Sequence, residues 1–580
     1  MGLGAGGLPD EVAASWAVTA FRDGAGLAER TWGMRSRLTD NGPEPTGGRT
    51  MVGQTHDTGM HPVLDVAIVG AGVSGLYSGW RWLRSPQGRG SRVTVFEMSD
   101  RVGGRLLSVA PPGLPQARVE LGGMRYISTQ TAVANLVAQL GLATEPFMVA
   151  EPENVAYLRG RHLRSADLQW PERVPYAIPE SDLAGFDIGF TALAATRYLS
   201  QVLHRDHVDL KTVDWDAVAR EGRLDGVPVR ELPMRYVYNR MVSHEVFQFA
   251  EDTSGYDSIF FTWNAADGFP WNIGDYGADV QYHRLVDGYE SLPKALHRVY
   301  TAAGGEVRFG HTVREVDAAT LPDGSIGVRL VVEHAGQLQT VLARKAVLAM
   351  PRRAIELLAQ RGALLGREQP AVHALVRSVT PIPLFKLALC YRERWWETLG
   401  IRQGQSVTDL PIRQCYYWPV GESNGPGVIL IYNDGLDLDY WAGLRQGSTP
   451  YANEHGNDPA QEWAQHPAPA RMVAEAHRQL MLMHGLEDRP AWQPYAAAYR
   501  DWGDDPFGGG ANFWPVGVDS QAVSRAIVQP RPGLPVYVCG EAYSHAQGWV
   551  EGALQTAEDM LQRCWGMAPP DAGSSLADGG

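Results

Sequence analysis

The arrangement of apolar and polar residues near position 65 predicts a buried strand followed directly by a helix. Apolar side chains run through 66–69 without alternation, which is typical of a parallel strand covered on both faces. A helix is expected over Leu76–Leu83 and a second, β-branched strand over Arg92–Glu97. The order strand, helix, strand indicates an α/β protein that begins with a βαβ unit.

Three glycines spaced G-x-G-x-x-G join the first strand to the helix and predict a dinucleotide cradle. Gly70 would permit the tight turn, Gly72 would let the backbone approach a pyrophosphate, and Gly75 would let the helix pack closely. Val73 and Ser74 open the helix, whose N-terminal amides would hold the phosphates. An ordinary turn is the alternative, but the residues that follow favour the cradle.

Glu97 ends the second strand, where an acid would accept hydrogen bonds from the hydroxyls of an adenosine ribose. An acid here favours a free ribose over the phosphorylated ribose of NADP. Met98 follows Glu97 in the chain. A second glycine pair then ends at Gly104 and is followed by Arg105. These glycines would again admit phosphate, and the arginine would offer a fixed positive charge.

A third glycine pair, Gly122 and Gly123, interrupts an apolar strand and is followed by Met124 and Arg125. The glycines indicate that the backbone passes close to something flat. Arg125 is either an ordinary surface charge or a group that recognises a carboxylate through two hydrogen bonds. Further on, residues 157–282 carry helical periodicities over 182–203 and 230–250, which predict an inserted helical domain.

The nucleotide-binding pattern resumes after this insertion. Arg284–Leu296 predicts a turn and an amphipathic helix, Glu306–Val316 an alternating strand that includes Val313, and Lys345–Pro351 a buried strand ended by proline. Leu534–Glu541 predicts another strand, ending in Gly540 and Glu541. A helix over Gln547–Ala557 then begins with Gly548, Trp549 and Val550. One cofactor domain is therefore assembled from three separated pieces.

Composition narrows the possible partners. The 580 residues are 44% hydrophobic and carry a net charge of −14 without a cluster of Lys and Arg, which argues against nucleic acid. Four cysteines form no C-x-x-C pair and no metal-ligand grouping, so we expect no metal and a reducing compartment. No apolar run is long enough for a membrane span, and no export signal is readable. We expect a cytoplasmic protein.

Several motifs together resemble the FAD-dependent amine oxidase superfamily and, within it, the L-amino acid oxidases. The resemblance covers roughly Val63–Leu561 and rests on motifs that occur in the family's order. They are Gly70–Gly75, Glu97, Arg101–Ser108, Gly122–Arg125, Gly540 with Glu541, and Gly548–Glu551. The resemblance implies FAD, contacted by Gly70, Gly72, Val73, Ser74, Gly75, Glu97, Met98, Gly104, Arg105, Gly122, Gly123, Met124, Arg125, Val313, Gly540, Glu541, Gly548, Trp549 and Val550.

The same resemblance implies roles for four catalytic residues. Arg125 and Tyr432, which lies in a segment similar to the family's, would hold the substrate carboxylate. Lys386 would hold a water molecule at flavin N5. Trp549, together with Trp502, would flank the substrate, with packing in the core as the alternative.

Departures from the family are also informative. Monoamine oxidases carry a cysteine that bonds the flavin, but Gly508–Trp514 contains none, so we expect noncovalent FAD. His244 is a candidate base or gate, although a lone helical histidine is more often structural. A substrate with a cationic side chain would suit Asp434, Asp437 and Asp439. We favour a substrate with a large hydrophobic or aromatic side chain, which would face Phe513, Trp514, Trp502 and Trp549.

The resemblance and the patterns together predict a Rossmann-like FAD-binding domain of the GR2 type, a mixed α+β substrate domain and an inserted helical domain. The FAD domain comprises 61–126, 284–360 and 532–566, the substrate domain 127–160 and 375–531, and the helical domain 161–283. An N-terminal arm over 1–60 and a disordered tail over 567–580 complete the chain.

The predicted reaction is oxidative deamination of an L-amino acid to a 2-oxo acid, ammonia and hydrogen peroxide, with oxygen as acceptor. We expect a homodimer or higher homo-oligomer. An L-amino acid 2-monooxygenase, which would release an amide, and an amine or polyamine oxidase remain alternatives.

Overall fold

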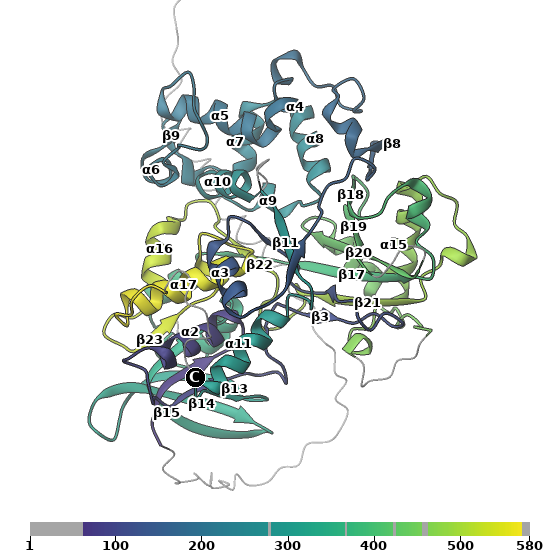
Figure 1. Cartoon of the computed structure of the whole chain (residues 1–580). Helices are drawn as coiled ribbons and strands as arrows, with labels where there is room; N and C mark the ends of the chain where they lie inside the picture. Colours follow the sequence, from purple (N-terminus) through teal and green to yellow (C-terminus); the bar gives the residue numbers. More distant parts are fainter. Residues whose placement is uncertain (1–61, 276–279, 366–367, 421–424, 455–461, 571–580) are drawn as a thin grey trace, which may run out of the picture. The chain divides into compact units, whose positions relative to one another are not determined.

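A computed structural model describes residues 62–275, 280–365, 368–420, 425–454 and 462–570 (Figure 1). The predicted N-terminal arm, 1–60, and most of the predicted tail, 567–580, lie outside the described residues. The described part is a mixed α/β fold with two seven-stranded sheets. Within it, no helix has the length and apolar character needed to cross a membrane.

The first sheet carries the predicted cradle. Its strands are ordered β12 (Glu306–Arg308), β2 (Val93–Phe96), β1 (Leu64–Val69), β15 (Gln337–Leu348), β14 (Ile326–His334) and β13 (Thr312–Thr320), with β23 (Val536–Val538) also on β15. β1 runs parallel to both β2 and β15, as expected for a buried strand without alternation. The β13, β14 and β15 strands are antiparallel. The predicted Glu306–Val316 strand is therefore wrong as a single element, because Gly310 has a positive φ of 66° and separates β12 from β13.

Three helices pack together beside this sheet: α2 (Val73–Arg84), α11 (Ser291–Ala302) and α17 (Val550–Arg563). The helices predicted from sequence at these places are confirmed, although α2 starts earlier and α11 and α17 end later than expected. Tyr77 donates its hydroxyl to Glu558 at 2.6 Å, and Arg81 pairs with the same carboxylate at 2.7 Å. These contacts join α2 to α17, 477 or more positions apart in the chain.

The second sheet supplies the opposite side of the site. Its order is β21 (Ala496–Asp501), β17 (Leu384–Tyr391), β20 (Gly427–Asp434), β19 (Gln414–Trp418), β18 (Gly404–Thr408), β7 (Val155–Leu158) and β8 (Arg161–Arg164). Side chains of β17 alternate between two cores: Leu387, Leu389 and Tyr391 pack with α15 (Ala470–Met483), while Ala388 and Cys390 belong to another core. Lys386 shares the face of Ala388 and Cys390, away from α15.

The insertion is helical, as predicted, but its helices are shorter than expected. They are α4 (Gly185–Ile188), α5 (Phe190–Leu203), α6 (Trp215–Glu221), α7 (Met234–Met241), α8 (His244–Ser254), α9 (Ser258–Phe261) and α10 (Ala265–Asp275). Gly189, with a φ of 87°, separates α4 from α5. Ser243 accepts a hydrogen bond from the Val246 amide and starts α8, so the 230–250 periodicity covers two helices.

Smaller elements complete the described chain. A three-stranded sheet contains β5 (Tyr126–Ile127), β11 (Tyr282–Leu285) and β6 (Thr144–Pro146). The two-stranded pairs are β3 (Ser108–Val109) with β4 (Val119–Glu120), β9 (Arg223–Leu224) with β10 (Val227–Pro228), and β16 (Thr380–Ile382) with β22 (Ala511–Phe513). The remaining α-helices are α3 (Thr131–Gln139), α12 (Arg352–Ala359), α13 (Pro370–Val376), α14 (Leu438–Arg445) and α16 (Ser520–Ile527).

Candidate active site

The glycine loop between β1 and α2 has the geometry of a cradle. Gly70 has a φ of 104°, and an added Cβ would lie 2.6 Å from the Ala349 carbonyl oxygen. A Cβ on Gly75 would lie 2.1 Å from the Gly70 carbonyl oxygen, so Gly75 permits close packing of α2 on the loop. A Cβ on Gly72 would meet nothing within 4 Å. The backbone at Gly72 therefore faces open space, as an approaching phosphate requires.

A cavity of about 950 Å³ extends from this loop to the second sheet. It is lined by every predicted cofactor residue except Gly75, which is occupied in packing against Gly70. The four predicted catalytic residues, Lys386, Arg125, Tyr432 and Trp549, also line it. Residues from separated parts of the chain therefore meet in one space, while the role of each remains a prediction.

Glu97 lies at the cavity edge, where its carboxylate holds the glycine loop. It accepts hydrogen bonds from the Ala71 amide at 2.8 Å and from the amide and hydroxyl of Ser99 at 3.0 and 2.8 Å. The predicted contact with ribose would add to these bonds, because a carboxylate has about four acceptor sites.

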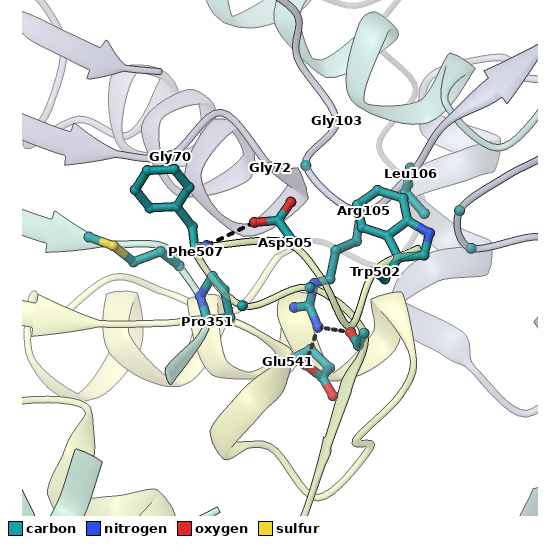
Figure 2. A pocket seen from close by; sticks show the side chains of 18 of the residues that line it. Gly70, Gly72, Gly103, Arg105, Leu106, Pro351, Trp502, Asp505, Phe507 and Glu541 are labelled. Atoms are coloured by element: carbon teal, nitrogen blue, oxygen red, sulfur yellow. Dashed lines mark hydrogen bonds and ion pairs between the residues drawn. The ribbon is translucent and has the colours of Figure 1, made fainter. Parts of the chain in front are cut away.

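Arg105 is paired within the protein instead of presenting an unneutralised charge for phosphate. Its guanidinium points at the carboxylate of Glu541 (Figure 2). It donates to that carboxylate at 2.6 Å and to the Gly510 carbonyl at 2.7 Å. Glu541 also accepts hydrogen bonds from the amide and side chain of Asn512, at 3.0 and 3.1 Å, and from the Gly548 amide at 2.8 Å. One buried carboxylate thus fixes three segments around the cavity.

Lys386 is 2% exposed and projects from β17 toward the segment that contains the third glycine pair. Its Nζ donates to the Gly122 carbonyl and lies 4.8 Å from the centre of the Tyr432 ring. Tyr432 stands directly opposite it on β20. Burial lowers the pKa of Lys386, while the nearby buried Glu120 opposes this shift. A buried amine with a lowered pKa can exchange a proton near neutrality.

Arg125 is 6% exposed and stands among aromatic rings on the cavity wall. Its guanidinium carbon lies 4.6 Å from the Tyr282 ring centre and 5.6 Å from that of Phe147. Its Nη1 donates to the Tyr416 hydroxyl at 3.3 Å. The rings orient the guanidinium and exclude water, which strengthens its interaction with an anion.

Two tyrosines that sequence reasoning missed connect Arg125 with Tyr432. The hydroxyls of Tyr416 and Tyr256 lie 3.0 Å apart, and the Tyr256 ring packs edge-on against Tyr432 with ring centres 5.2 Å apart. Tyr416 lies on β19, the neighbour of the β20 strand that carries Tyr432. Tyr256 follows α8 in the helical insertion, and its sequence surroundings gave no indication.

Two tryptophans line the cavity from different elements. Trp549 donates its Nε1 hydrogen to Asp275 at 2.5 Å, and burial raises the pKa of Asp275 to about 7. Trp502 is 4% exposed and donates to the Leu121 carbonyl at 2.7 Å, so it belongs to a core as well as to the wall. Asp275 was another residue that the sequence did not indicate.

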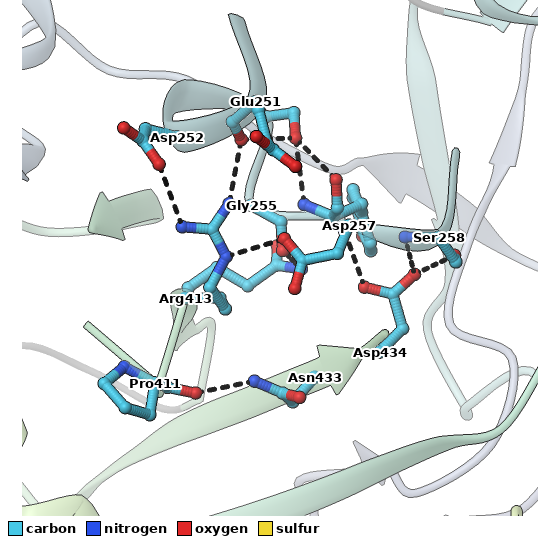
Figure 3. Close-up of polar contacts among 12 residues, drawn as sticks. Glu251, Asp252, Gly255, Asp257, Ser258, Pro411, Arg413, Asn433 and Asp434 are labelled. Carbon is cyan, nitrogen blue, oxygen red and sulfur yellow. Dashed lines mark hydrogen bonds and ion pairs between the residues drawn. The ribbon is translucent and has the colours of Figure 1, made fainter. Parts of the chain in front are cut away.

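Of the three acidic residues considered as partners for a cationic substrate, only Asp434 lines the cavity. Asp434 lines the cavity, but Figure 3 shows its carboxylate directed at Ser258, whose amide and hydroxyl both donate to it. It also accepts from the Asp257 amide at 3.1 Å. Asp437 and Asp439 do not line the cavity. Trp514, expected to face the substrate, does not line it either. The candidate base His244 is exposed at the start of α8, away from the cavity lining.

Asp434 also belongs to a polar network that joins the helical insertion to the second sheet (Figure 3). Arg413, 4% exposed, donates to Asp257 at 2.9 Å and to the Glu251 carbonyl at 2.8 Å. This network holds Tyr256, which lies between Glu251 and Asp257 in the chain, at the cavity wall.

Comparisons with known proteins agree with this fold. A family model described as flavin containing amine oxidoreductase matches residues 74–560. Aplysianin-A from Aplysia kurodai is 27% identical over 86% of this chain and 90% of its own length. L-amino acid oxidase Bs29 from Bothriechis schlegelii is 25% identical over 85% of this chain and 88% of its own length. Cyclohexylamine oxidase from Brevibacterium oxydans IH-35A is 18% identical, with a TM-score of 0.62 over 87% of this chain and its entire length.

The chain therefore belongs to the flavin-containing amine oxidoreductase family. It is an FAD-dependent oxidoreductase that acts on CH–NH₂ groups of small molecules. The cavity fits that cofactor, because the open backbone at Gly72 and the glycine at 104 leave room for a pyrophosphate beside the first turn of α2.

Proposed function

We propose that this protein is an L-amino acid oxidase that converts an L-amino acid and oxygen to a 2-oxo acid, ammonia and hydrogen peroxide. The observation that carries the proposal is the position of Arg125, a buried cation on the wall of the cavity that also contains Lys386 and Tyr432. A guanidinium in this position suits a substrate carboxylate. It would repel the ammonium group of a simple amine, because like charges interact strongly where water is excluded.

The protein's own residues then divide the work. Arg125 and Tyr432 hold the carboxylate, and Tyr416 and Phe147 hold Arg125 in place. Trp549 and Trp502 close the sides of the substrate site. Lys386 holds a water molecule beside Tyr432, through the hydrogen-bonding capacity that its bond to the Gly122 carbonyl leaves. FAD, when bound, supplies the hydride acceptor and returns the electrons to oxygen.

We also propose that FAD is held without a covalent bond. All four cysteines lie in the described part of the chain, and none lines the cavity. Acid precipitation of the holoenzyme should therefore release intact FAD into the supernatant. Flavin retained in the pellet would contradict this part of the proposal.

For the substrate side chain we propose a large hydrophobic or aromatic group. Phe513, Trp502, Trp549 and Ile259 give the wall an apolar character, and the carboxylate of Asp434 is already engaged by Ser258. The hydrogen bonds from Ser258 and the Asp257 amide thus occupy acceptor positions of Asp434 that a cationic side chain would need.

One screen tests the proposal against its alternatives. Holoenzyme is supplied with each of the twenty L-amino acids and with the amine formed by decarboxylating each one, while peroxide, ammonia and organic products are measured. The proposal predicts peroxide and a 2-oxo acid from amino acids alone. Amide formation would indicate a 2-monooxygenase, and faster turnover of amines would indicate an amine oxidase. A best substrate with a cationic side chain would overturn only the side-chain proposal.

A further inference from the structure

A second cavity, of about 330 Å³, lies between the β6–β11 pair and the segments that flank β18 and β19. Three arginines line it, Arg284, Arg394 and Arg402, against a single acidic residue, Glu145. Its remaining walls mix aromatic residues, among them Trp396 and Trp418, with aliphatic and polar ones. Such an excess of guanidinium groups in one concave site attracts anions.

Two of these arginines are held in place by the fold. Arg284 is 13% exposed and ion-paired with Glu145, its neighbour across the β6–β11 ladder. Arg394 is 12% exposed, is ion-paired with Glu397 at 3.4 Å, and donates through Nε and Nη2 to the Pro426 carbonyl, both at 3.3 Å. Fixed guanidinium groups lose little conformational freedom when they bind a ligand.

Arg394 is fully engaged, whereas Arg284 and Arg402 keep hydrogen-bonding capacity. Arg284 contacts Glu145 and the Pro419 carbonyl through Nη2 alone, so its Nη1 keeps hydrogen-bonding capacity for a ligand. Arg402 is exposed and forms no ion pair with any described residue. The cavity therefore offers donors and positive charge that the described residues do not satisfy.

We propose that this cavity is a binding site for a small oxyanion, a phosphate or a carboxylate, separate from the catalytic cavity. The oxyanion accepts hydrogen bonds from Arg284 and Arg402, beside the rings of Trp396 and Trp418. Phe147 separates this site from the catalytic one: it lines the arginine cavity, and its ring centre lies 5.6 Å from the Arg125 guanidinium.

Thermal unfolding of the FAD-loaded protein tests the proposal, with phosphate and acetate titrated separately at ionic strength held constant with sodium chloride. At least one of the two anions should raise the unfolding midpoint saturably, and the arm that does so identifies the oxyanion class. Arg402→Gln, an exposed change that leaves the core intact, should weaken the apparent affinity about tenfold, and Arg284→Gln at least as much. Arg205→Gln, at an exposed site elsewhere, is the matched control and should behave as wild type.

Arg125→Ala distinguishes the two cavities. The proposal predicts that the saturable effect survives in this variant, because the anion binds behind Phe147. The proposal is overturned if neither anion has a saturable effect, if Arg125→Ala abolishes the effect, or if Arg402→Gln responds in the same way as Arg205→Gln. Should Arg284→Gln fail to fold, the Arg402→Gln comparison still decides the matter.

Discussion

The guanidinium of Arg105 lies 2.6 Å from the carboxylate of Glu541, and the pair joins segments 436 positions apart at the cavity. Only 5% of the Glu541 side chain is exposed, against 31% for Arg105. Because the carboxylate also binds Asn512 and Gly548, this contact fixes the walls against which a cofactor must fit.

Glu541→Gln should lower both stability and FAD retention. The substitution removes one charge from a partly buried pair and turns two acceptor positions into a donor, which we expect to cost about 1–3 kcal/mol. Chemical denaturation and FAD titration measure the two effects. Asp559→Asn breaks the exposed pair with Arg563 and should cost under about 0.5 kcal/mol. Equal losses in the two variants would show that Glu541 has no special role in the cavity.

Gly72→Val and Gly75→Val should fail in different ways. A side chain at Gly72 points into open space, so the apoprotein should fold normally and lose FAD binding. A side chain at Gly75 collides with the Gly70 carbonyl and should destabilise the fold itself. Circular dichroism melting and flavin absorbance separate the outcomes. A Gly72→Val protein that purifies yellow would place the cofactor elsewhere.

Lys386→Met should slow reoxidation by oxygen about tenfold or more while leaving reduction by substrate within about threefold. The reason is that only reoxidation uses the water held by the amine. Rapid mixing measures the two half-reactions separately. Lys345→Met is a matched control: Lys345 lies off the cavity, 4.7 and 4.4 Å from the ring centres of Trp82 and Trp565. Equal slowing of both half-reactions in Lys386→Met would remove this lysine from its proposed role.

Stability should depend on His484 at acidic pH. Burial lowers the pKa of this histidine to about 4, and its two nitrogens contact the Leu480 carbonyl and the Tyr417 hydroxyl. Since the unfolded value is about 6.5, the unfolded chain binds more protons between these limits. The stabilising contribution is therefore complete above about pH 6.5 and is lost as the pH falls toward 4, by on the order of 2–3 kcal/mol.

Denaturation of wild type and His484→Gln at several pH values tests this linkage. The difference in unfolding free energy between the two proteins should shrink as the pH falls from 7 to about 4.5. The exposed His207 provides a control through His207→Gln, whose difference from wild type should stay constant. Parallel curves for His484→Gln and wild type would contradict the prediction.

The sequence predicted the cradle well because its determinants are local. Gly70, Gly72 and Gly75 act within one turn, and the unalternating apolar run before them has few structural alternatives. The alternation along Glu306–Val316 also indicated strand, but the break at Gly310 was missed, since a glycine inside a strand pattern does not reveal its φ.

Contacts between distant segments could not be predicted from patterns. Arg105 was expected to bind phosphate. Its pairing with Glu541 was not foreseen, because Glu541 comes from the other end of the chain. Asp434 was considered as a partner for a cationic substrate. Its hydrogen bond with Ser258 was not foreseen, because Ser258 belongs to the helical insertion. Tyr256 reaches the cavity from that insertion, and Asp275 of the same insertion contacts Trp549 on the cavity wall; nothing in the local sequence marks either residue. The oligomeric state and the cellular compartment stay predictions.

The contact on which the proposed function depends is the one between Arg125 and a substrate carboxylate. A charged hydrogen-bonded pair of this kind is worth about 1.5–3 kcal/mol, and its loss also leaves a buried carboxylate without its partner, at further cost. Each 1.4 kcal/mol is about tenfold in rate. Arg125→Lys should restore only part of what Arg125→Ala loses, because an ammonium cannot reproduce the planar fork. Tyr432→Phe should cost less, on the order of 1 kcal/mol, because the charge pair remains.

The most direct measurement compares kcat/KM of wild type and Arg125→Ala on the best L-amino acid and on its decarboxylated amine. The account predicts that the variant loses roughly a hundredfold or more on the amino acid, while the amine, which has no carboxylate to lose, is a poor substrate for wild type and is not turned over more slowly by the variant. Amino acid turnover within about threefold of wild type, or an amine that is the better substrate from the outset, would contradict it.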